Sequence, residues 1–144
     1  MNSPQAASRF EVRLLEKKDG PAMRELFKEV FRQDLSQAFW NWKYLFEDSC
    51  AVGVFSEGVL VGHYGGLVAN IRYKGKDARA VQIVDVMVKS TVRRAVRKQS
   101  PFYLAGSYFL EHFIGYNKPN LLGYGFPSDR HMLLAEHMRF YASV

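Results

Sequence analysis

A carboxylate inside an apolar run is the first residue that could do chemistry. Ile83 to Val88 is apolar and mostly β-branched except for Asp85, a pattern that predicts a largely buried strand. A buried carboxylate costs free energy unless a partner satisfies it. Asp85 is therefore a candidate catalytic base. The alternative is a structural role, as the partner of a backbone group or of an arginine.

A basic segment directly follows this strand. Its cations are Lys89, Arg93, Arg94, Arg97 and Lys98. Ser100 then offers a helix N-cap, and Pro101 suits the first helical position. The first N–H groups of a helix lack partners and carry partial positive charge, so a helix start beside several cations favours an anion such as a diphosphate. Charged loops also join strands to helices without binding anything, and the residues alone leave both interpretations open.

The histidines and the cysteine do not suggest a metal centre. His63 lies in a predicted strand beside glycines and could line a cleft. His131 is a second candidate base, although its position is more typical of an exposed surface residue, and His112 and His137 fit ordinary helix positions. No ligand spacing joins the four, so we expect no metal site. The lone Cys50 excludes an internal disulfide and a cysteine-rich zinc site.

The composition is that of an ordinary folded domain. We expect residues 1–9 to form a disordered lead and residues 10–144 a single domain with one sizeable core. The net charge of +6 is spread along the chain, so nucleic acid is not an expected partner. No apolar stretch is long enough to cross a membrane and the N-terminus has no apolar signal-peptide centre, which favours a cytoplasmic protein.

Hydrophobic spacing predicts the elements of the first third of the chain. Alternation over Phe10–Leu14 indicates a strand, and helical spacing indicates a helix from Pro21 to Phe31. Asp34 or Ser36 can cap a second helix that is unusually rich in aromatic residues. This helix is either a core element or a wall of a substrate cleft.

An antiparallel series of strands is expected next. The strand-like runs are Ala51–Phe55, Val59–Val68, Asn70–Tyr73 and Ala78–Val88, with turns at Ser56–Gly58 and Lys74–Asp77. A helix from Pro101 to Ile114 leads into a strand at Leu121–Phe126, which should lie parallel to Ile83–Val88. Pro127–Asp129 can cap a short helix, and Phe140–Val144 could begin another strand. The sequence thus predicts an α/β (α+β) fold with a mixed, mostly antiparallel, twisted sheet flanked by helices.

Three segments carry a more specific pattern. They are FWNWKYLFED at Phe39–Asp48, the long stretch Gly58–Val88, and GYGFPSDRHMLLAEHMRF at Gly123–Phe140. The first looks like a tryptophan- and lysine-rich helix found in a bacterial branch of the Gcn5-related N-acetyltransferase (GNAT) superfamily. The second resembles that family's strand pair and long central strand, and the third its later strand, following helix and aromatic residue. In the order and spacing of these parts, the chain resembles the family from Phe10 to its end.

The resemblance implies acetyl-CoA as co-substrate and no metal. In the family, the central strand pairs with the pantetheine arm, and the loop and helix start that follow hold the diphosphate. Carried onto this sequence, the cofactor-binding residues are Val86, Met87, Val88, Arg94, Arg97, Lys98, Gln99, Ser100, Pro101 and Phe102.

The loop departs from the family's pattern, which is usually Arg/Gln-x-x-Gly-x-Gly/Ala. No glycine occurs between Arg93 and Ser100, although glycine lets a backbone turn its N–H groups closely toward phosphates. Either the side chains of Arg94, Arg97 and Lys98 replace part of that backbone cradle, or CoA binding is weakened.

The resemblance also implies that an amine attacks the thioester directly, with a base to take its proton and a donor for the leaving thiolate. Ala135 stands where the family commonly has a donor tyrosine. Tyr141 or Tyr124 would then substitute, and Asp85 is the candidate base. The acceptor would be the amine of a small molecule, peptide or protein. The alternative is a non-catalytic domain of the same fold that binds CoA or a protein partner.

The family normally adds two strands after its last helix, whereas this sequence stops at Val144. We therefore expect either a fragment of a longer protein, truncated at its C-terminal strands, or a sheet that a second chain completes. An unpaired sheet edge favours association, so a homodimer is predicted.

Overall fold

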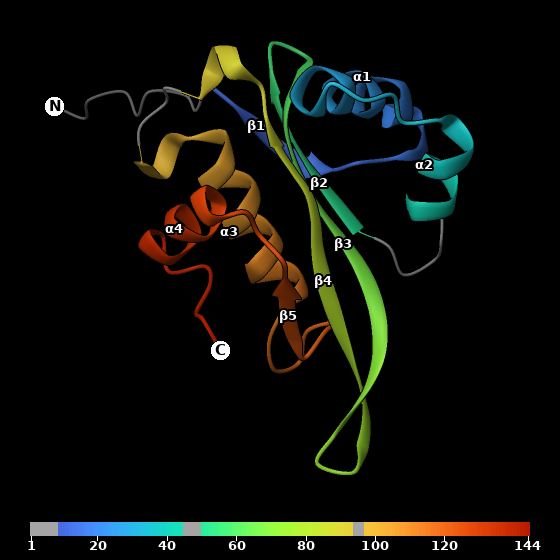
Figure 1. Ribbon diagram of the computed structural model, residues 1–144, viewed down its shortest axis with the longest axis vertical. Helices are drawn as coiled ribbons and strands as arrows, with labels where there is room; N and C mark the ends of the chain where they lie inside the picture. The colour runs from blue at the N-terminus through green and yellow to red at the C-terminus, as the bar shows by residue number, and fades with distance from the viewer. Residues whose placement is uncertain (1–8, 45–49, 94–96) are drawn as a thin grey trace, which may run out of the picture.

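A mixed sheet forms the centre of the protein. The computed structural model describes residues 9–44, 50–93 and 97–144, without the side chain of Arg97. Within them, a five-stranded sheet has the order β1-β2-β3-β4-β5 (Figure 1). Its strands are β1 Glu11–Leu14, β2 Cys50–Ser56, β3 Val59–Tyr73, β4 Lys76–Val88 and β5 Leu122–Gly125. The first three pairings are antiparallel and β4–β5 is parallel, which confirms the predicted fold class.

Helices cover both faces of the sheet. Helices α1 (Gly20–Phe31) and α2 (Gln37–Tyr44) lie on one side, and α3 (Pro101–Phe113) and α4 (Asp129–His137) on the other (Figure 1). Short 3-10 turns, η1 Lys17–Asp19, η2 Ser90–Val92 and η3 Arg97–Gln99, connect them. None of the described helices is both long and apolar enough to span a bilayer. Of the predicted lead, all but Arg9 falls outside the described residues.

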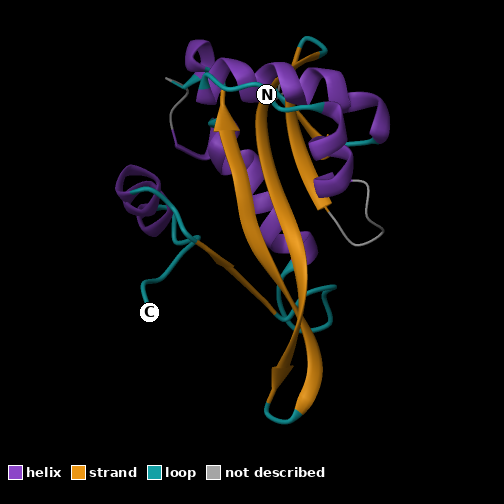
Figure 2. Cartoon of the chain, turned by 45° about the vertical axis from the view of Figure 1, so that its right-hand side comes forward, coloured by secondary structure: helices purple, strands orange, loops and turns teal. Residues whose placement is uncertain are grey.

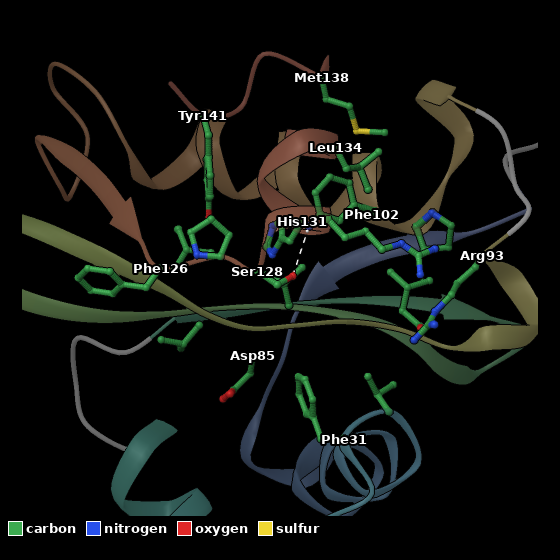
Figure 3. A pocket seen from close by; sticks show the side chains of 18 of the residues that line it. Phe31, Asp85, Arg93, Phe102, Phe126, Ser128, His131, Leu134, Met138 and Tyr141 are labelled. Carbon is green, nitrogen blue, oxygen red and sulfur yellow. Dashed lines mark hydrogen bonds between the residues drawn. The ribbon is translucent and has the colours of Figure 1, made fainter. Parts of the chain in front are cut away.

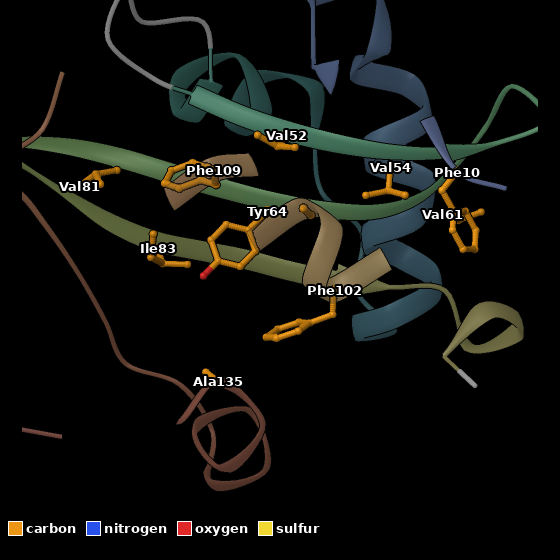
Figure 4. Close-up of a cluster of buried hydrophobic side chains, with 11 residues drawn as sticks. Phe10, Val52, Val54, Val61, Tyr64, Val81, Ile83, Phe102, Phe109 and Ala135 are labelled. Carbon is orange, nitrogen blue, oxygen red and sulfur yellow. The ribbon is translucent and has the colours of Figure 1, made fainter. Parts of the chain in front are cut away.

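The strand periodicity divides the core between these two layers. Successive side chains of a strand point to opposite faces, so Val54 and Phe55 belong to different clusters. One cluster gathers around Tyr64 and Phe109 beneath α3 (Figure 4). The other gathers around Met23 in α1 and includes Leu26, Leu35, Trp40, Phe55, Leu60 and Met87. Cys50, the first residue of β2, is half-buried.

Serine caps start three of the helices where the sequence predicted helix starts. The Ser100 hydroxyl accepts a hydrogen bond from the Tyr103 N–H at 3.2 Å. The Ser128 hydroxyl accepts from the His131 N–H at 3.4 Å, and that of Ser36 accepts from the Phe39 N–H at 3.1 Å. These bonds satisfy N–H groups that would otherwise lack partners in the first turn.

Two expected features of the strands differ. Val59–Val68 and Asn70–Tyr73 form one continuous strand, because β4 pairs with β3 along its whole length down to the Tyr73–Lys76 turn. This makes a long hairpin that projects from the rest of the sheet (Figure 2). Phe140–Val144 does not form a strand. Instead, the Phe140 ring packs on α3, with ring centroids 5.9 Å from Phe102 and 5.4 Å from Tyr103.

The β4–β5 pairing is short. β5 pairs with Ala80–Ile83 of β4, and beyond Ile83 the strands diverge (Figure 2). Directly after that point, the β3–β4 register shifts opposite His63 and Gly65, and Asp85 has φ +50°. A bulge of this kind bends a strand and locally ends its regular pairing. The sheet therefore opens at the C-terminal end of β4.

An ion pair fixes the N-terminal strand β1 to η1, the turn that leads into α1. The Arg13 guanidinium donates two bonds to the Asp19 carboxylate, at 2.8 and 2.9 Å, and the Glu16 N–H donates a third at 2.8 Å. The hydrogen bond from Arg13 lowers the pKa of Asp19. Burial acts to raise this pKa but is outweighed, so the pKa lies below its ordinary value.

We expect Asp19→Asn to lower the free energy of unfolding at pH 7 by about 1–3 kcal/mol, because the guanidinium and the Glu16 N–H lose a charged acceptor. Since the folded pKa is depressed, this contribution is present above the unfolded pKa, near 3.8, and is lost as the pH falls through the folded pKa. Urea unfolding at pH 7 and at the lowest pH that both proteins tolerate measures it. If the wild type and Asp19→Asn differ as much in free energy of unfolding in acid as at pH 7, this account is contradicted.

Candidate active site

A cavity occupies the opening beside β4. Its volume is about 700 Å³. Side chains of α1 and Lys43 of α2 line one side, and the start of α3 and the segment from Phe126 to Tyr141 line the other. Figure 3 shows Phe31 on the first side and Phe102, His131 and Tyr141 on the second. Because these helices cover opposite faces, the cavity connects the two faces of the sheet around the edge of β4. A ligand entering from one face can thus meet a second ligand arriving from the other.

The exposed edge of β4 is the first binding feature. Val84, Val86 and Val88 line the cavity, and among the described residues no strand pairs with this edge beyond Ile83. Backbone N–H and C=O groups at an open edge readily pair with an extended chain. The Val88 carbonyl already accepts from the Arg93 Nε at 2.9 Å. An amide-bearing arm fits the remaining edge as a substitute strand.

The start of α3 is the second binding feature of the cavity. Ser100, Pro101 and Phe102 line the cavity, and the N-terminus of this 13-residue helix carries partial positive charge. It lies close to β3: a Cβ placed on Gly62 would be 3.3 Å from the Pro101 Cβ. The guanidinium groups of Arg93 and Arg130 also line the cavity. Two cations and a helix start suit an anionic group.

Asp85 lies at the junction between the faces. Its side chain points toward α2, across β4 from Ser128 and His131 (Figure 3). The carboxylate contacts the Lys43 Nζ at 2.6 Å and accepts a hydrogen bond from the Tyr44 hydroxyl. Both members of the ion pair are largely buried, with side chains 12% and 11% exposed. The partner of this carboxylate is therefore a lysine together with a tyrosine.

The His63 side chain contacts the backbone of the bulge at Asp85. Its ring is buried, and Nδ1 lies 2.7 Å from the Asp85 carbonyl oxygen, so Nδ1 carries the proton and donates. Burial lowers the pKa of His63, which keeps the ring neutral. Burial, with the neighbouring Asp85 charge, raises the pKa of Tyr44. Tyr44 thus remains a hydroxyl donor to Asp85 at neutral pH.

His131 and Tyr141 form the opposite wall. Their rings stack with centroids 5.7 Å apart, and Phe102 meets the imidazole edge to face at 5.4 Å. The interpretation of His131 as an exposed surface residue is therefore wrong: these aromatic rings cover it. Burial lowers the pKa of His131 and raises that of Tyr141. A Cβ placed on Gly125 would be 3.2 Å from the Tyr141 hydroxyl, so this hydroxyl lies against β5.

The structure brings together many of the predicted site residues. Those that line the cavity are Asp85, Val86, Val88, Ser100, Pro101, Phe102 and Tyr141. The Met87 side chain instead packs in the core under α1, and Lys98 and Gln99 are exposed outside the cavity lining. Arg94 lies outside the described residues, as does the side chain of Arg97. Their role in cofactor binding stays a prediction.

Sequence reasoning missed Lys43 and Arg130, both of which line the cavity. The signals for Lys43 were its place in the aromatic helix, for which a cleft wall was one of two interpretations, and the resemblance of that segment to a lysine-rich helix of the family. Arg130 follows the predicted Ser128 cap, so it belongs to the first turn of α4. An arginine in the first turn of a helix could have suggested a cation at the entrance of a binding site.

The acetyltransferase (GNAT) domain family matches residues 11–99, which is more than half of the chain. The chain belongs to the GNAT acetyltransferase family. This match contains β1 through β4 and the loop after β4, including Lys43 and Asp85. A search of curated protein sequences gives no significant match.

Solved structures with the same architecture are distant in sequence. An aminoglycoside N-acetyltransferase in complex with CoA aligns with a TM-score of 0.68 at 15% identity, covering 97% of this chain and 93% of its own. Glucosamine-6-phosphate N-acetyltransferase from Arabidopsis thaliana aligns with a TM-score of 0.69 at 14% identity, covering 94% and 93%. A transcriptional regulator from Bacillus halodurans C-125 aligns with a TM-score of 0.74 at 11% identity, covering 94% and 95%. At these identities, the likeness establishes the GNAT fold.

The Lys43–Asp85 pair can be tested by a double-mutant cycle. We expect Asp85→Asn to lower the free energy of unfolding by about 3 kcal/mol, because it leaves a buried ammonium without its counter-charge. Adding Lys43→Met should recover more than half of this loss, since no unpaired charge is then left. The exposed Arg72–Asp77 pair, 3.3 Å apart, supplies the control: Asp77→Asn should cost less than about 0.5 kcal/mol. Additive losses in the double variant would contradict a coupled pair.

Proposed function

We propose that this GNAT domain is an acetyl-CoA-dependent N-acetyltransferase that transfers the acetyl group to an amine. The observation that carries the proposal is the cavity itself. It runs from an unpaired strand edge and a helix N-terminus, around β4, to the Asp85 carboxylate on the other face. Acetyl-CoA supplies the acetyl group as an activated thioester, and the residues on the α3 side would hold it.

The described residues divide the binding of acetyl-CoA between them. The edge of β4 at Val86 and Val88 pairs with the amides of the pantetheine arm. The start of α3, with Arg93 and Arg130, faces its phosphates. The sequence adds Arg94, Arg97 and Lys98 of the glycine-free loop as further cations for the diphosphate. This division follows from charge and from backbone groups that lack a strand partner.

The acceptor amine approaches from the face covered by α1 and α2. Asp85 takes its proton, so that the nitrogen lone pair attacks the thioester carbonyl carbon and the carbon–sulfur bond breaks. Tyr141 supplies a proton to the sulfur. Burial raises the pKa of this tyrosine, so its hydroxyl is still protonated at neutral pH when the thiolate leaves. Holding the amine beside the thioester provides most of the rate.

The charges around the cavity favour a particular acceptor. Among the described lining residues, Lys43, Arg93 and Arg130 are cationic and Asp85 is the one carboxylate. Val30 and Phe31 add an apolar surface on the acceptor side. An acceptor with one amine and an apolar body fits this lining better than a polycation such as an aminoglycoside, which solved neighbours of the same fold acetylate. A panel of arylalkyl amines and aminoglycosides would rank the two classes by thiol release.

A non-catalytic role is the second candidate. The absence of glycine from the loop between Arg93 and Ser100 favours it, because the close backbone cradle for a diphosphate is weakened. Such a domain would bind CoA or a protein without transferring an acetyl group. Calorimetry with acetyl-CoA, followed by the amine panel, separates the candidates: binding without thiol release would support this second one.

Arg130→Glu tests the phosphate end of the cavity. Reversing a charge beside a bound polyanion should raise the Kd for acetyl-CoA about tenfold, which corresponds to roughly 1.4 kcal/mol. The effect should shrink as salt is added. Arg72→Glu, in the projecting hairpin, is the matched control and should leave the Kd unchanged. Equal affinities for Arg130→Glu and wild type at low salt would argue against this end as the phosphate site.

Tyr141→Phe tests the proposed proton donor. Loss of the hydroxyl should lower kcat about a hundredfold, within the range for a general acid, while the Kd for acetyl-CoA stays within a factor of two or so because the ring remains. Steady-state kinetics with calorimetry measures both. An unchanged kcat would remove Tyr141 from the mechanism, and Tyr124→Phe would then be examined in the same assay.

A further inference from the structure

An amine of the protein itself already lies on the acceptor side of the cavity. Among the described residues, Lys43 is the one lysine in the cavity lining. The other cations there are the guanidinium groups of Arg93 and Arg130, which do not lose their charge in proteins and are not acceptors for an acetyl group. Lys43 is thus the described primary amine available to a thioester held in this cavity.

Its surroundings match those required of an acceptor. The Lys43 Nζ lies 2.6 Å from the Asp85 carboxylate, the group that takes the acceptor's proton in the proposed reaction. The Phe39 and Tyr44 rings, each with its centroid 5.8 Å from Nζ, border it. An external ammonium would have to displace Lys43 from Asp85 before it could use this base. Lys43 therefore occupies the acceptor position in the absence of another amine.

The position also distinguishes Lys43 from the surface lysines. Lys28 and Lys18 pair with acidic groups too, at 2.9 and 3.1 Å, but their side chains are 67% and 68% exposed, against 12% for Lys43. Of these three, Lys43 is therefore the lysine whose ammonium is held against a carboxylate largely away from solvent. Loss of one proton from it gives the amine that attacks a thioester.

We propose that Lys43 is an internal acceptor and that the protein acetylates itself at this residue. The inference rests on the proposed function, since it needs acetyl-CoA in the cavity. One Nζ proton passes to Asp85, the Nζ lone pair forms a bond to the thioester carbonyl carbon, and the carbon–sulfur bond breaks. The second Nζ proton, lost as the amide forms, passes to the leaving thiolate, and Asp85 returns the first to solvent, so the reaction releases one proton overall. The products are acetyl-Lys43 and CoA.

This reaction has a consequence for the site. Acetylation removes the lysine charge, so the ion pair with Asp85 is lost while the bulkier amide stays on the acceptor side. Transfer to external amines should then slow as acetyl-Lys43 accumulates, and a slow loss of rate during preincubation with acetyl-CoA would accompany the modification.

The experiment incubates the purified protein with acetyl-CoA and no added amine, and follows each lysine by peptide mass spectrometry. We expect the initial rate at Lys43 to exceed that at Lys28 by about tenfold or more, because a positioned amine has a high effective concentration. The rate constant should not depend on protein concentration, as the reaction is intramolecular. Asp85→Asn should slow modification of Lys43 but not of Lys28. Lys43→Arg keeps the charge and should abolish the preferred site.

Calorimetry of acetyl-CoA binding on the same samples separates the two hypotheses. Binding with acetylation at Lys43 no faster than at Lys28 overturns the internal acceptor and leaves the proposed function standing. Absence of binding overturns both. If Asp85→Asn fails to fold, as judged by circular dichroism, the comparison of Lys43 with Lys28 in the wild type and the test of concentration dependence still decide the outcome.

Discussion

The separation of β4 from β5 is the constraint on which the rest of the site depends. Parallel neighbours can pair along their whole length, but here pairing stops at Ile83 and the bulge at Asp85 follows. Backbone groups left without partners in a protein interior are costly, so the gap must be filled by solvent or by a ligand with its own amides. The same bulge turns one carboxylate toward α2. A single local irregularity thus creates both the binding edge and the polar centre.

The helices give the two faces of the sheet different charge and polarity. The α3 side contributes a helix N-terminus and guanidinium groups, which favour an anion. The α1–α2 side contributes aromatic and apolar side chains around one ion pair, Lys43–Asp85. Neutral His63 and protonated Tyr44 hold that pair without adding charge. Because the charges differ between the faces, the two substrates of a transfer reaction can be separated until they meet at Asp85.

Much of the fold could be predicted from local patterns. The caps at Ser100 and Ser128 are hydrogen bonds within one helical turn, so sequence spacing reveals them directly. The parallel placement of Leu122–Gly125 followed from the crossover helix, and the family resemblance agrees with the GNAT match. The break expected at Ala69 was wrong, because β3 pairs with β4 on both sides of this residue and Ala69 itself pairs with Ala80.

The site was less predictable because its contacts join distant residues. Asp85 was identified as unusual, yet its partners Lys43 and Tyr44 depend on how α2 is oriented over the sheet. Burial of His131 depends on Tyr141, which lies beyond α4, and on Phe102 in α3. No local spacing encodes such tertiary contacts. Sequence alone can therefore indicate that a carboxylate needs a partner, but not which one it finds.

The half-buried cysteine at the start of β2 has a practical consequence for enzymology. Burial raises the pKa of Cys50 to about 12, so at neutral pH only on the order of one molecule in a hundred thousand carries the reactive anion. It is also the single cysteine of the sequence. A chromogenic aromatic disulfide, which detects the thiol of liberated CoA, should therefore give very little background signal from the protein's own thiol. The wild-type protein can be assayed in this way without first replacing Cys50.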